Sequence, residues 1–279
     1  MTSRNSWKPG VGIRILDNDG GFSPEGFGKY KENGIPYAEL SLRHNELENM
    51  NFYDKPEILN NLANSSGVEF WSFHIPFGNE INPAILNEKE CKEAMAIMEK
   101  GIRAAAKVGI QTMVIHPSAE PNKPEERREK MKKSIENMKI LSDLCRSLGA
   151  VLAVEDLPRT CLGNCSDEII EFLGSIPSLM LCYDTNHLTV QKNSDFLNAL
   201  IEHGLHGRIR TVHVSDYDGI DEKHRLPFDG VNDWKDILSK LEVLDYNGVF
   251  MYEVDKAWDR DKPYTVKDVA QNFEKMMKL

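Results

Sequence analysis

The chain has 279 residues, of which 41% are hydrophobic and 28% are charged, a composition typical of soluble globular proteins with a large core. Its formal net charge of −10 disfavours DNA or RNA as a partner, because the surface repels phosphate groups on average. The first residues lack the apolar segment of a signal peptide, and no apolar run reaches the roughly 18 residues of a membrane-spanning helix, so we expect no membrane association.

The cysteines form no recognisable pairing pattern. The five residues lie at positions 91, 145, 161, 165 and 182. Cys161 and Cys165 are close in sequence, but no second pair completes a zinc-finger spacing. We interpret all five as reduced thiols and therefore expect a cytoplasmic protein.

Eight short β-rich runs alternate with longer helical patterns along the chain. The runs occupy residues 11–16, 37–42, 69–75, 112–116, 151–157, 179–184, 210–216 and 248–254. Several of them are apolar throughout instead of alternating, which is typical of strands that are covered on both faces. These runs predict eight strands of a largely buried sheet.

Amphipathic stretches between the runs predict helices. They occupy residues 24–33, 56–66, 91–109, 125–149, 195–204, 233–244 and 266–279. In residues 91–109 the apolar side chains repeat on one helical face, and the pattern stops at Gly109, as helices often do at a glycine.

A strand–helix unit repeated eight times predicts a right-handed series that closes on itself. We therefore expect an α/β protein with a single (β/α)8 TIM barrel, formed as one domain by residues 1–279. The alternative is an open doubly wound sheet, which would normally carry a glycine-rich phosphate loop after its first strand. The segment LDNDGGFSPEGFG does not match that motif.

Six of the predicted strands end in a side chain that binds metal ions. These ends are His74, His116, Glu155, Asp184 with His187 close behind it, His213 and Glu253. Successive ends are separated by about one strand–helix unit, so the side chains return to the same rim of a barrel.

A carboxylate within an apolar run such as VLAVE is costly to bury unless a positive charge meets it. We therefore predict that Glu155, Asp184, His213 and Glu253 hold one divalent metal ion, and mixed carboxylate and imidazole ligands suit manganese, zinc or magnesium. His74 and His116 could bind the metal, support its ligands or contact substrate.

Three further side chains near the strand ends have two interpretations each. Glu39 ends the second strand as either a structural carboxylate or another rim group. Trp71 and Phe73 flank His74, where they could form an apolar wall for a sugar ring or belong to the core. The remaining histidines at 44, 203 and 206 are interpreted as solvated.

The strand-end motifs resemble those of the xylose isomerase-like barrels. The segments that carry the resemblance are FHIPFG, VIHPS, AVEDLP, CYDTNHL, TVHVSDYDG, EKHRLPFDGVNDW and MYEV, within roughly residues 10–255. This superfamily includes sugar and sugar-phosphate isomerases and epimerases, hydroxypyruvate isomerase, inosose dehydratase and the endonuclease IV type of DNA repair enzyme. The motifs are specific for the superfamily and poor at choosing among its members.

The ketose 3-epimerase branch implies roles for most of these residues. One divalent metal would be held by Glu155, Asp184, His213 and Glu253, and the two glutamates would also move the substrate proton from opposite faces. His187 would contact the substrate as a catalytic residue. His74, His116, His224 and Arg225 are expected to bind substrate. The usual Pro-Gly-x-Gly turn reads Pro-Phe-Asp-Gly at residues 227–230, so the first glycine is missing.

The endonuclease branch implies a different use of the same rim. It holds three zinc ions with nine ligands, of which seven match His74, His116, Glu155, Asp184, His187, His213 and Glu253. Glu222 and His224 could supply the remaining pair, with Glu in place of Asp. The net charge of −10 stands against a nucleic-acid substrate.

We therefore expect a metal-dependent isomerase or epimerase of carbohydrate metabolism that acts on a small sugar, sugar phosphate or sugar acid through proton transfer and an enediolate. A phosphate on the substrate would be met by Lys223 or Arg225. The alternatives are an inosose dehydratase-like lyase on the same metal site, an endonuclease IV-like zinc phosphodiesterase acting on abasic DNA, and a non-catalytic protein with a structural metal. The sequence leaves open whether the protein forms a homo-oligomer.

Overall fold

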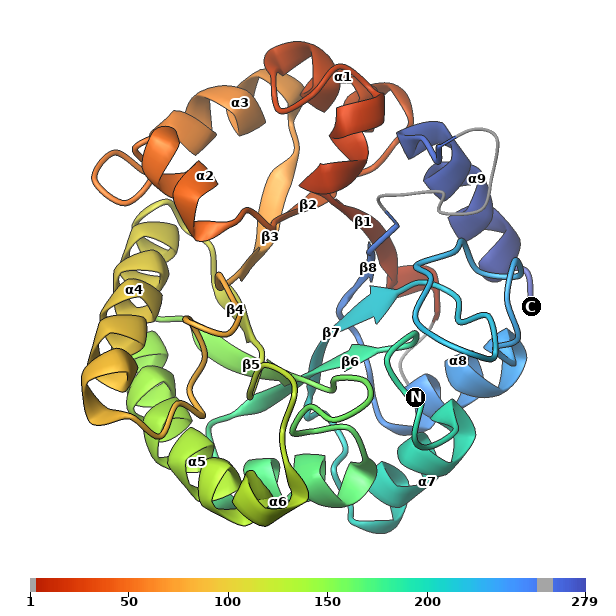
Figure 1. The fold of residues 1–279 in the computed structure, drawn as a ribbon. Coiled ribbons are helices and arrows are strands. Elements are labelled where there is room, and N and C mark those ends of the chain that lie inside the picture. The colour runs from red at the N-terminus through yellow and green to blue at the C-terminus, as the bar shows by residue number, and fades with distance from the viewer. Residues whose placement is uncertain (1–3, 255–262) are drawn as a thin grey trace.

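The structure is a computed structural model that describes residues 4–254 and 263–279. Within these residues, eight parallel strands close into a barrel in the order of the sequence (Figure 1). The strands are β1 Lys8–Gly12, β2 Tyr37–Leu40, β3 Glu69–His74, β4 Thr112–Ile115, β5 Val151–Glu155, β6 Met180–Asp184, β7 Ile209–Val214 and β8 Val249–Tyr252. Pairing of β1 with β8 closes the ring, so the predicted (β/α)8 TIM barrel is confirmed.

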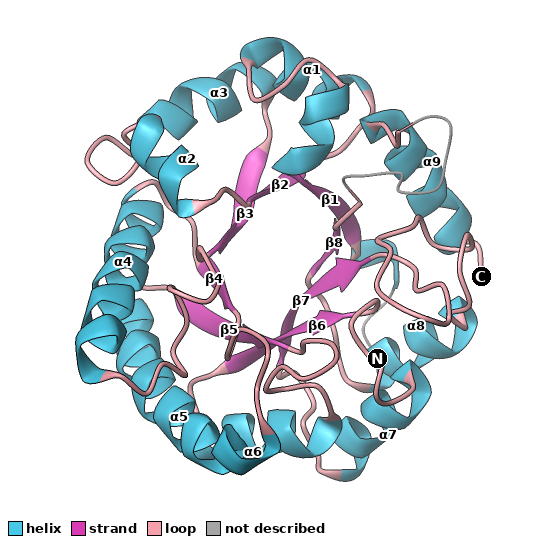
Figure 2. Cartoon of the chain, in the orientation of Figure 1, coloured by secondary structure: helices cyan, strands magenta, loops and turns pink. Residues whose placement is uncertain are grey.

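The helices form an outer ring around the strands (Figure 2). They are α1 Pro24–Glu32, α2 His44–Asn49, α3 Ile58–Ser66, α4 Glu88–Lys107, α5 Pro124–Ser147, α6 Ser166–Ser175, α7 Asn193–Glu202, α8 Trp234–Val243 and α9 Val266–Met276. No helix in the described part of the chain combines the length and the apolar character needed to cross a membrane.

Local chemistry explains where the helices begin and end. The side chain of Asn87 accepts hydrogen bonds from two backbone N–H groups at the start of α4, and Thr265 forms a capping box with Asp268 at the start of α9. After α4 the chain turns at Gly109, whose φ of 90° favours glycine. The buried face of α4 carries Ala94, which packs in the main core.

The first strand was predicted too late in the sequence. It lies at Lys8–Gly12, and residues Ile13–Asn18 form a 3-10 helix instead. Ile15 and Leu16 are fully buried in this helix, so their apolar run resembles that of a buried strand. Helices α2 and α6 were not predicted, although the buried Ile169, Phe172 and Leu173 of α6 repeat at the spacing of one helical face.

The strand register sets the height of polar side chains inside the barrel. Asp184 pairs directly with His213 across β6 and β7, and Glu155 pairs with Cys182 across β5 and β6. Because side chains alternate along a strand, the residue two positions before each of these points the same way. Ala153 and Cys182 stand two positions before Glu155 and Asp184, so along β5 and β6 the barrel interior changes from apolar side chains to carboxylates towards the carboxyl ends.

Candidate active site at the carboxyl ends of the strands

Four predicted metal ligands meet in the barrel. Glu155, Asp184, His213 and Glu253 each place one ligand atom within 4.8 Å of the others. They come from β5, β6, β7 and the residue directly after β8. Glu155, Asp184 and His213 are fully buried, and the side chain of Glu253 is 34% exposed.

The orientation of His213 is fixed by a carboxylate from β2. Its Nε2 lies 3.1 Å from Oε2 of Glu39, which also accepts a hydrogen bond of 2.6 Å from the Ser72 hydroxyl. With Nε2 as the donor, Nδ1 presents a lone pair to the other ligands. Nδ1 is 3.0 Å from Oε1 of Glu155 and 3.1 Å from Oε2 of Glu253. Only a proton or a cation at this point makes these contacts attractive.

Two carboxylate oxygens of the group have no hydrogen-bond partner. Among the described residues, Oδ2 of Asp184 and Oε2 of Glu253 are buried and accept no hydrogen bond. Leaving such atoms unsatisfied costs about 1–3 kcal/mol each, and more when they are charged. A divalent cation between them would satisfy both oxygens, and the donor set of three carboxylates and one imidazole suits manganese, zinc or magnesium. The residues therefore fit the metal ion that the sequence predicts.

The electrostatics of the group indicate an excess of negative charge. Burial raises the pKa of Asp184 well above its ordinary value, and the charges of Glu253 and Glu155 add to this effect. Burial alone would lower the pKa of His213, but the neighbouring acidic groups, Cys182 and Glu39 first among them, raise it well above its ordinary value. Both shifts favour uptake of positive charge, as protons or as a cation.

A second cluster shares Glu155 with the first. Oε2 of Glu155 lies 3.0 Å from Nε2 of His74 and 3.2 Å from Nε2 of His116. The Nδ1 of His74 donates to the carbonyl of Ile75 at 3.1 Å, and in the protonated ring Nε2 donates to the carboxylate. Burial lowers the pKa of His74, but the hydrogen bond and charge of Glu155 outweigh it and raise that pKa to about 9. These three side chains also have the spacing of cation ligands.

A third cluster lies on the loops that follow β6 and β7. His187 donates from Nδ1 to the carbonyl of Asp156 at 2.9 Å, and its Nε2 lies 3.5 Å from Oε2 of Glu222. His224 completes a three-residue group with ligand-like spacing. Its Nδ1 donates to the carbonyl of Glu253 at 3.0 Å, which ties this loop to the four-ligand group. All six predicted strand-end residues and His187 thus share one face of the barrel.

Two cavities open above these clusters. One of about 370 Å³ is lined by His116, His187, His224 and Glu253, and one of about 700 Å³ is lined by His74 and Glu253. Phe77 lines both, stacks on the ring of His116 at 3.8 Å between centroids, and is 56% exposed. Such concave, partly polar sites are typical of small-molecule binding.

The aromatic wall comes from a residue that sequence reasoning missed. Phe73 is fully buried in the main core, and Trp71 stacks with Arg210, whose guanidinium carbon lies 4.6 Å from the ring centroid. Neither lines the two cavities, which contradicts the interpretation as an apolar wall, and the alternative interpretation as a core residue is confirmed for Phe73. Phe77, three residues after His74 in the motif FHIPFG, is the aromatic side chain that lines both cavities.

The basic residues predicted for a substrate phosphate lie away from the cavity linings. Among the described residues, neither Lys223 nor Arg225 lines the 370 Å³ or the 700 Å³ cavity. Arg225 pairs through its backbone with Asp216 and donates from Nη1 to the carbonyl of Asp229 at 3.3 Å. The role of Arg225 in substrate binding stays a prediction.

The turn that lacks a glycine keeps a glycine-like backbone. Phe228 stands at the missing position with a φ of 77°, in the left-handed region that favours glycine. Its N–H donates to Oδ2 of Asp216 at 2.9 Å, and the same carboxylate accepts from the indole N–H of Trp234 at 2.9 Å. Asp216, buried and two residues after the end of β7, therefore holds the loop that carries His224.

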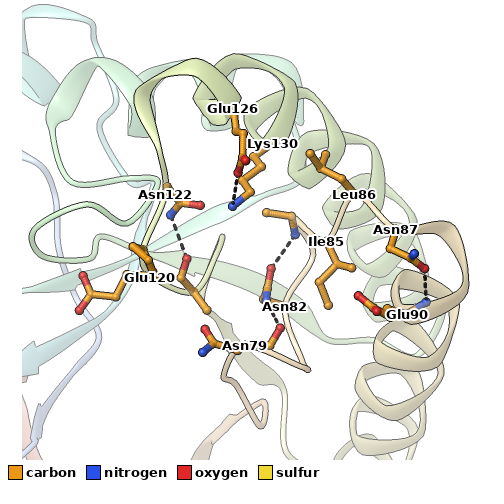
Figure 3. Close-up of a pocket in the computed structure, with 13 residues that line it drawn as sticks. Asn79, Asn82, Ile85, Leu86, Asn87, Glu90, Glu120, Asn122, Glu126 and Lys130 are labelled. Atoms are coloured by element: carbon orange, nitrogen blue, oxygen red, sulfur yellow. Dashed lines mark hydrogen bonds and ion pairs between the residues drawn. The ribbon is translucent and has the colours of Figure 1, made fainter.

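A further pocket of about 320 Å³ lies outside the barrel mouth, between α5 and the start of α4 (Figure 3). Its polar side chains are largely satisfied by one another. Lys130 pairs with Glu126 at 3.2 Å, and Asn82 accepts the N–H of Ala84 at 3.1 Å. The described residues that line it include no histidine, unlike those that line the two cavities at the strand ends.

Comparisons with known proteins agree with this architecture. Among curated proteins, the chain is 25% identical over 186 residues to an uncharacterized protein of Methanocaldococcus jannaschii, in an alignment that covers 64% of the chain and 62% of that relative's length.

Solved structures resemble the whole chain. A D-tagatose 3-epimerase-like protein superposes with a TM-score of 0.79 at 21% identity and covers 97% of this chain and 96% of its own. An L-ribulose 3-epimerase gives 0.77 at 14%, with 97% and 94% covered, and a D-psicose 3-epimerase from Clostridium cellulolyticum gives 0.72 at 16%, with 97% and 94% covered. Residues 27–276 match the family described as xylose isomerase-like TIM barrels, and the chain belongs to that family.

Proposed function

We propose that this protein is a divalent-metal-dependent isomerase or epimerase of a small sugar, sugar phosphate or sugar acid. The observation that carries the proposal is the convergence of Glu155, Asp184, His213 and Glu253, with unsatisfied oxygens on Asp184 and Glu253, below a cavity of monosaccharide-compatible size. The structural likeness to proteins named as ketose 3-epimerases supports the same reaction class.

Glu155, Asp184, His213 and Glu253 would hold the metal. When bound, the metal would supply a Lewis acid that polarises the carbonyl of a hydroxy-carbonyl substrate. Glu155 ends β5 and Glu253 directly follows β8, three strands further around the ring, so the two carboxylates would approach the metal from different directions. One carboxylate removes the α-proton and the other returns it. Return to the opposite face of the same carbon of the enediolate gives epimerisation, and return to the neighbouring carbon gives isomerisation.

The surrounding side chains orient the substrate in this proposal. His187 directs Nε2 towards the 370 Å³ cavity because its Nδ1 is bonded to a backbone carbonyl. It would form a hydrogen bond with a substrate oxygen and stabilise negative charge that develops there. The remaining hydroxyl groups would contact His74, His116 and His224. Arg225 would bind a substrate that is long enough to reach its loop. The ring of Phe77 would pack against the C–H face of the sugar.

The proposal is tested by metal analysis followed by solvent-deuterium wash-in over a panel of ketoses and ketose phosphates. We expect incorporation at one carbon, which is lost in Glu155→Gln and in Glu253→Gln. Glu136→Gln, on the exposed face of α5, is the matched control and keeps the wild-type rate. A panel that is silent throughout with metal-loaded protein would refute the proposal.

A second candidate function follows from the two additional clusters. His74, His116 and Glu155 form one cation-sized group, and His187, Glu222 and His224 form another, next to the four-ligand group. Three such groups match the zinc phosphodiesterase alternative. Metal stoichiometry separates the two functions, since one ion per chain supports sugar chemistry, whereas three zinc ions with incision of an abasic-site duplex support the phosphodiesterase.

A further inference from the structure

Arg159 joins loops from several strands at the mouth of the site. It lies between β5 and α6, and its guanidinium contacts three carboxylates. Nε is 2.9 Å from Glu120, Nη1 is 2.8 Å from Asp221 and Nη2 is 3.0 Å from Glu222. Glu120 follows β4, and the other two residues follow β7. One side chain therefore bridges loops that are far apart in sequence.

The backbone of Arg159 is held as firmly as its side chain. Its φ of 50° lies in the left-handed region, which a non-glycine residue adopts only when its surroundings hold it there. The N–H donates to the Thr189 hydroxyl at 3.1 Å, and the carbonyl accepts from the side chain of Asn164. Since Thr189 follows β6, loops after β4, β5, β6 and β7 meet at this residue.

Glu222 connects Arg159 to the candidate catalytic residues. Its Oε1 is bound by Arg159, and its Oε2 lies 3.5 Å from Nε2 of His187. His187 is fixed from the other side by the carbonyl of Asp156. The carboxylate of Glu222 therefore spans the guanidinium and the imidazole nitrogen that faces the cavity.

Charge explains why Glu222 needs this partner. Glu120, Asp221 and Glu222 are three like charges around one cation, and without it they would repel one another. Among the described residues that line the 370 Å³ cavity, Arg159 is the sole lysine or arginine. Its donors already bind three carboxylates, so it is not free to bind a substrate phosphate.

We propose that Arg159 is a positioning residue, which clamps the loop bearing Glu222 and His224 over the cavity and holds the Glu222 carboxylate against His187. The proposal rests on the proposed function for its kinetic consequence only, because the clamp itself is a property of the unliganded protein. Loss of the clamp lets the loop move away, so substrate contacts made by His187 and His224 weaken.

The test compares Arg159→Met with Arg127→Met. Arg127 is a matched control because it binds the same β5–α6 loop through the carbonyls of Thr160 and Cys161, and through Glu168, without touching Glu222. We expect Arg159→Met to lower kcat/KM about tenfold or more, mainly through KM, since charge-assisted hydrogen bonds are lost. Arg159→Lys should recover part of the loss, and Arg127→Met should stay within about twofold of wild type.

Two further readouts separate positioning from a general loss of structure. In a double-mutant cycle, Glu222→Gln should add little to Arg159→Met, whereas it should add its full effect to Arg127→Met. Hydrogen–deuterium exchange of the metal-free protein should increase in residues 217–225 for Arg159→Met and stay unchanged there for Arg127→Met.

The exchange measurement needs no substrate, so it tests the clamp even if the sugar reaction is not found. Unchanged exchange in residues 217–225 of Arg159→Met would overturn the proposal. Wash-in activity that is equal in the two methionine variants would overturn its kinetic part and leave the proposed function intact. If Arg159→Met does not fold, Arg159→Lys against Arg127→Lys answers the same question.

Discussion

Two layers of side chains in the barrel interior contrast in their chemistry, and β5 and β6 contribute to both. The lower layer contains Val114, Ala153 and Cys182, which are fully buried and form an apolar cluster separate from the main core. The upper layer, two residues further along β5 and β6, contains Glu155 and Asp184. One layer is packed and neutral, and the other is charged with unsatisfied oxygens.

This difference shows how the fold separates stability from chemistry. An apolar layer gains free energy from burial alone and needs no partner. A layer of buried carboxylates and imidazoles is costly until a cation or protons complete it. Variants in the upper layer should therefore affect metal and catalysis, and variants in the lower layer should affect folding stability.

The largest effect is expected for Glu155→Gln, because this carboxylate belongs to both the four-ligand group and the group with His74 and His116, and is a proposed proton carrier. We expect wash-in activity to fall about 10³-fold or more. The melting temperature of the metal-free variant should fall below that of the metal-free parent at neutral pH, because the Glu155 carboxylate stabilises the protonated form of His74. Retained activity with normal metal content would contradict the assignment of the chemistry to the upper layer, since that layer would then be structural.

Metal removal should destabilise the protein. A ligand at 100 times its Kd stabilises the folded state by about 2.7 kcal/mol, so chelation should lower the melting temperature and metal addition should restore it.

The pKa of His74 is raised from 6.5 to about 9, so its contribution to metal-free stability is complete below pH 6.5 and is lost as pH rises through 9. The melting temperatures of loaded and metal-free protein should therefore diverge over this range.

Glu39→Gln tests the support of the upper layer from β2. Glu39 accepts from Nε2 of His213, so the amide variant weakens the hydrogen bond that orients the imidazole. We expect metal affinity, measured by competitive titration with a chromogenic chelator, to fall about 10- to 100-fold. An exposed control, Glu136→Gln, should bind metal as wild type does. Equal affinity in the two variants would assign Glu39 a purely structural role.

The smallest effect on activity is expected for Val114→Ala in the lower layer. Removal of two buried methyl groups should lower the free energy of unfolding by about 1–2 kcal/mol, measured by urea denaturation. The wash-in rate of the folded fraction should not change. A large loss of activity at unchanged stability would show that the two layers are not independent.

Sequence patterns were informative where the physics is local. Continuous apolar runs predicted seven strands to within a few residues, and the stop at Gly109 predicted the end of α4. The predicted position of the first strand was wrong, because Ile15 and Leu16 are as buried in a 3-10 helix as they would be in a strand. Glu39 was left with two interpretations, since one carboxylate at a strand end does not reveal which imidazole lies opposite.

The sequence by itself determined the alternation of strands and helices and the identity of the polar residues at the strand ends, since both depend on neighbours along the chain. The tertiary structure alone decided which of these residues share a cation-sized space and which nitrogen of His213 faces it. It also decided that Arg159 meets carboxylates 39, 62 and 63 residues away. Such contacts depend on barrel closure and strand register, which bring distant loops to one rim and leave no local signal in the chain.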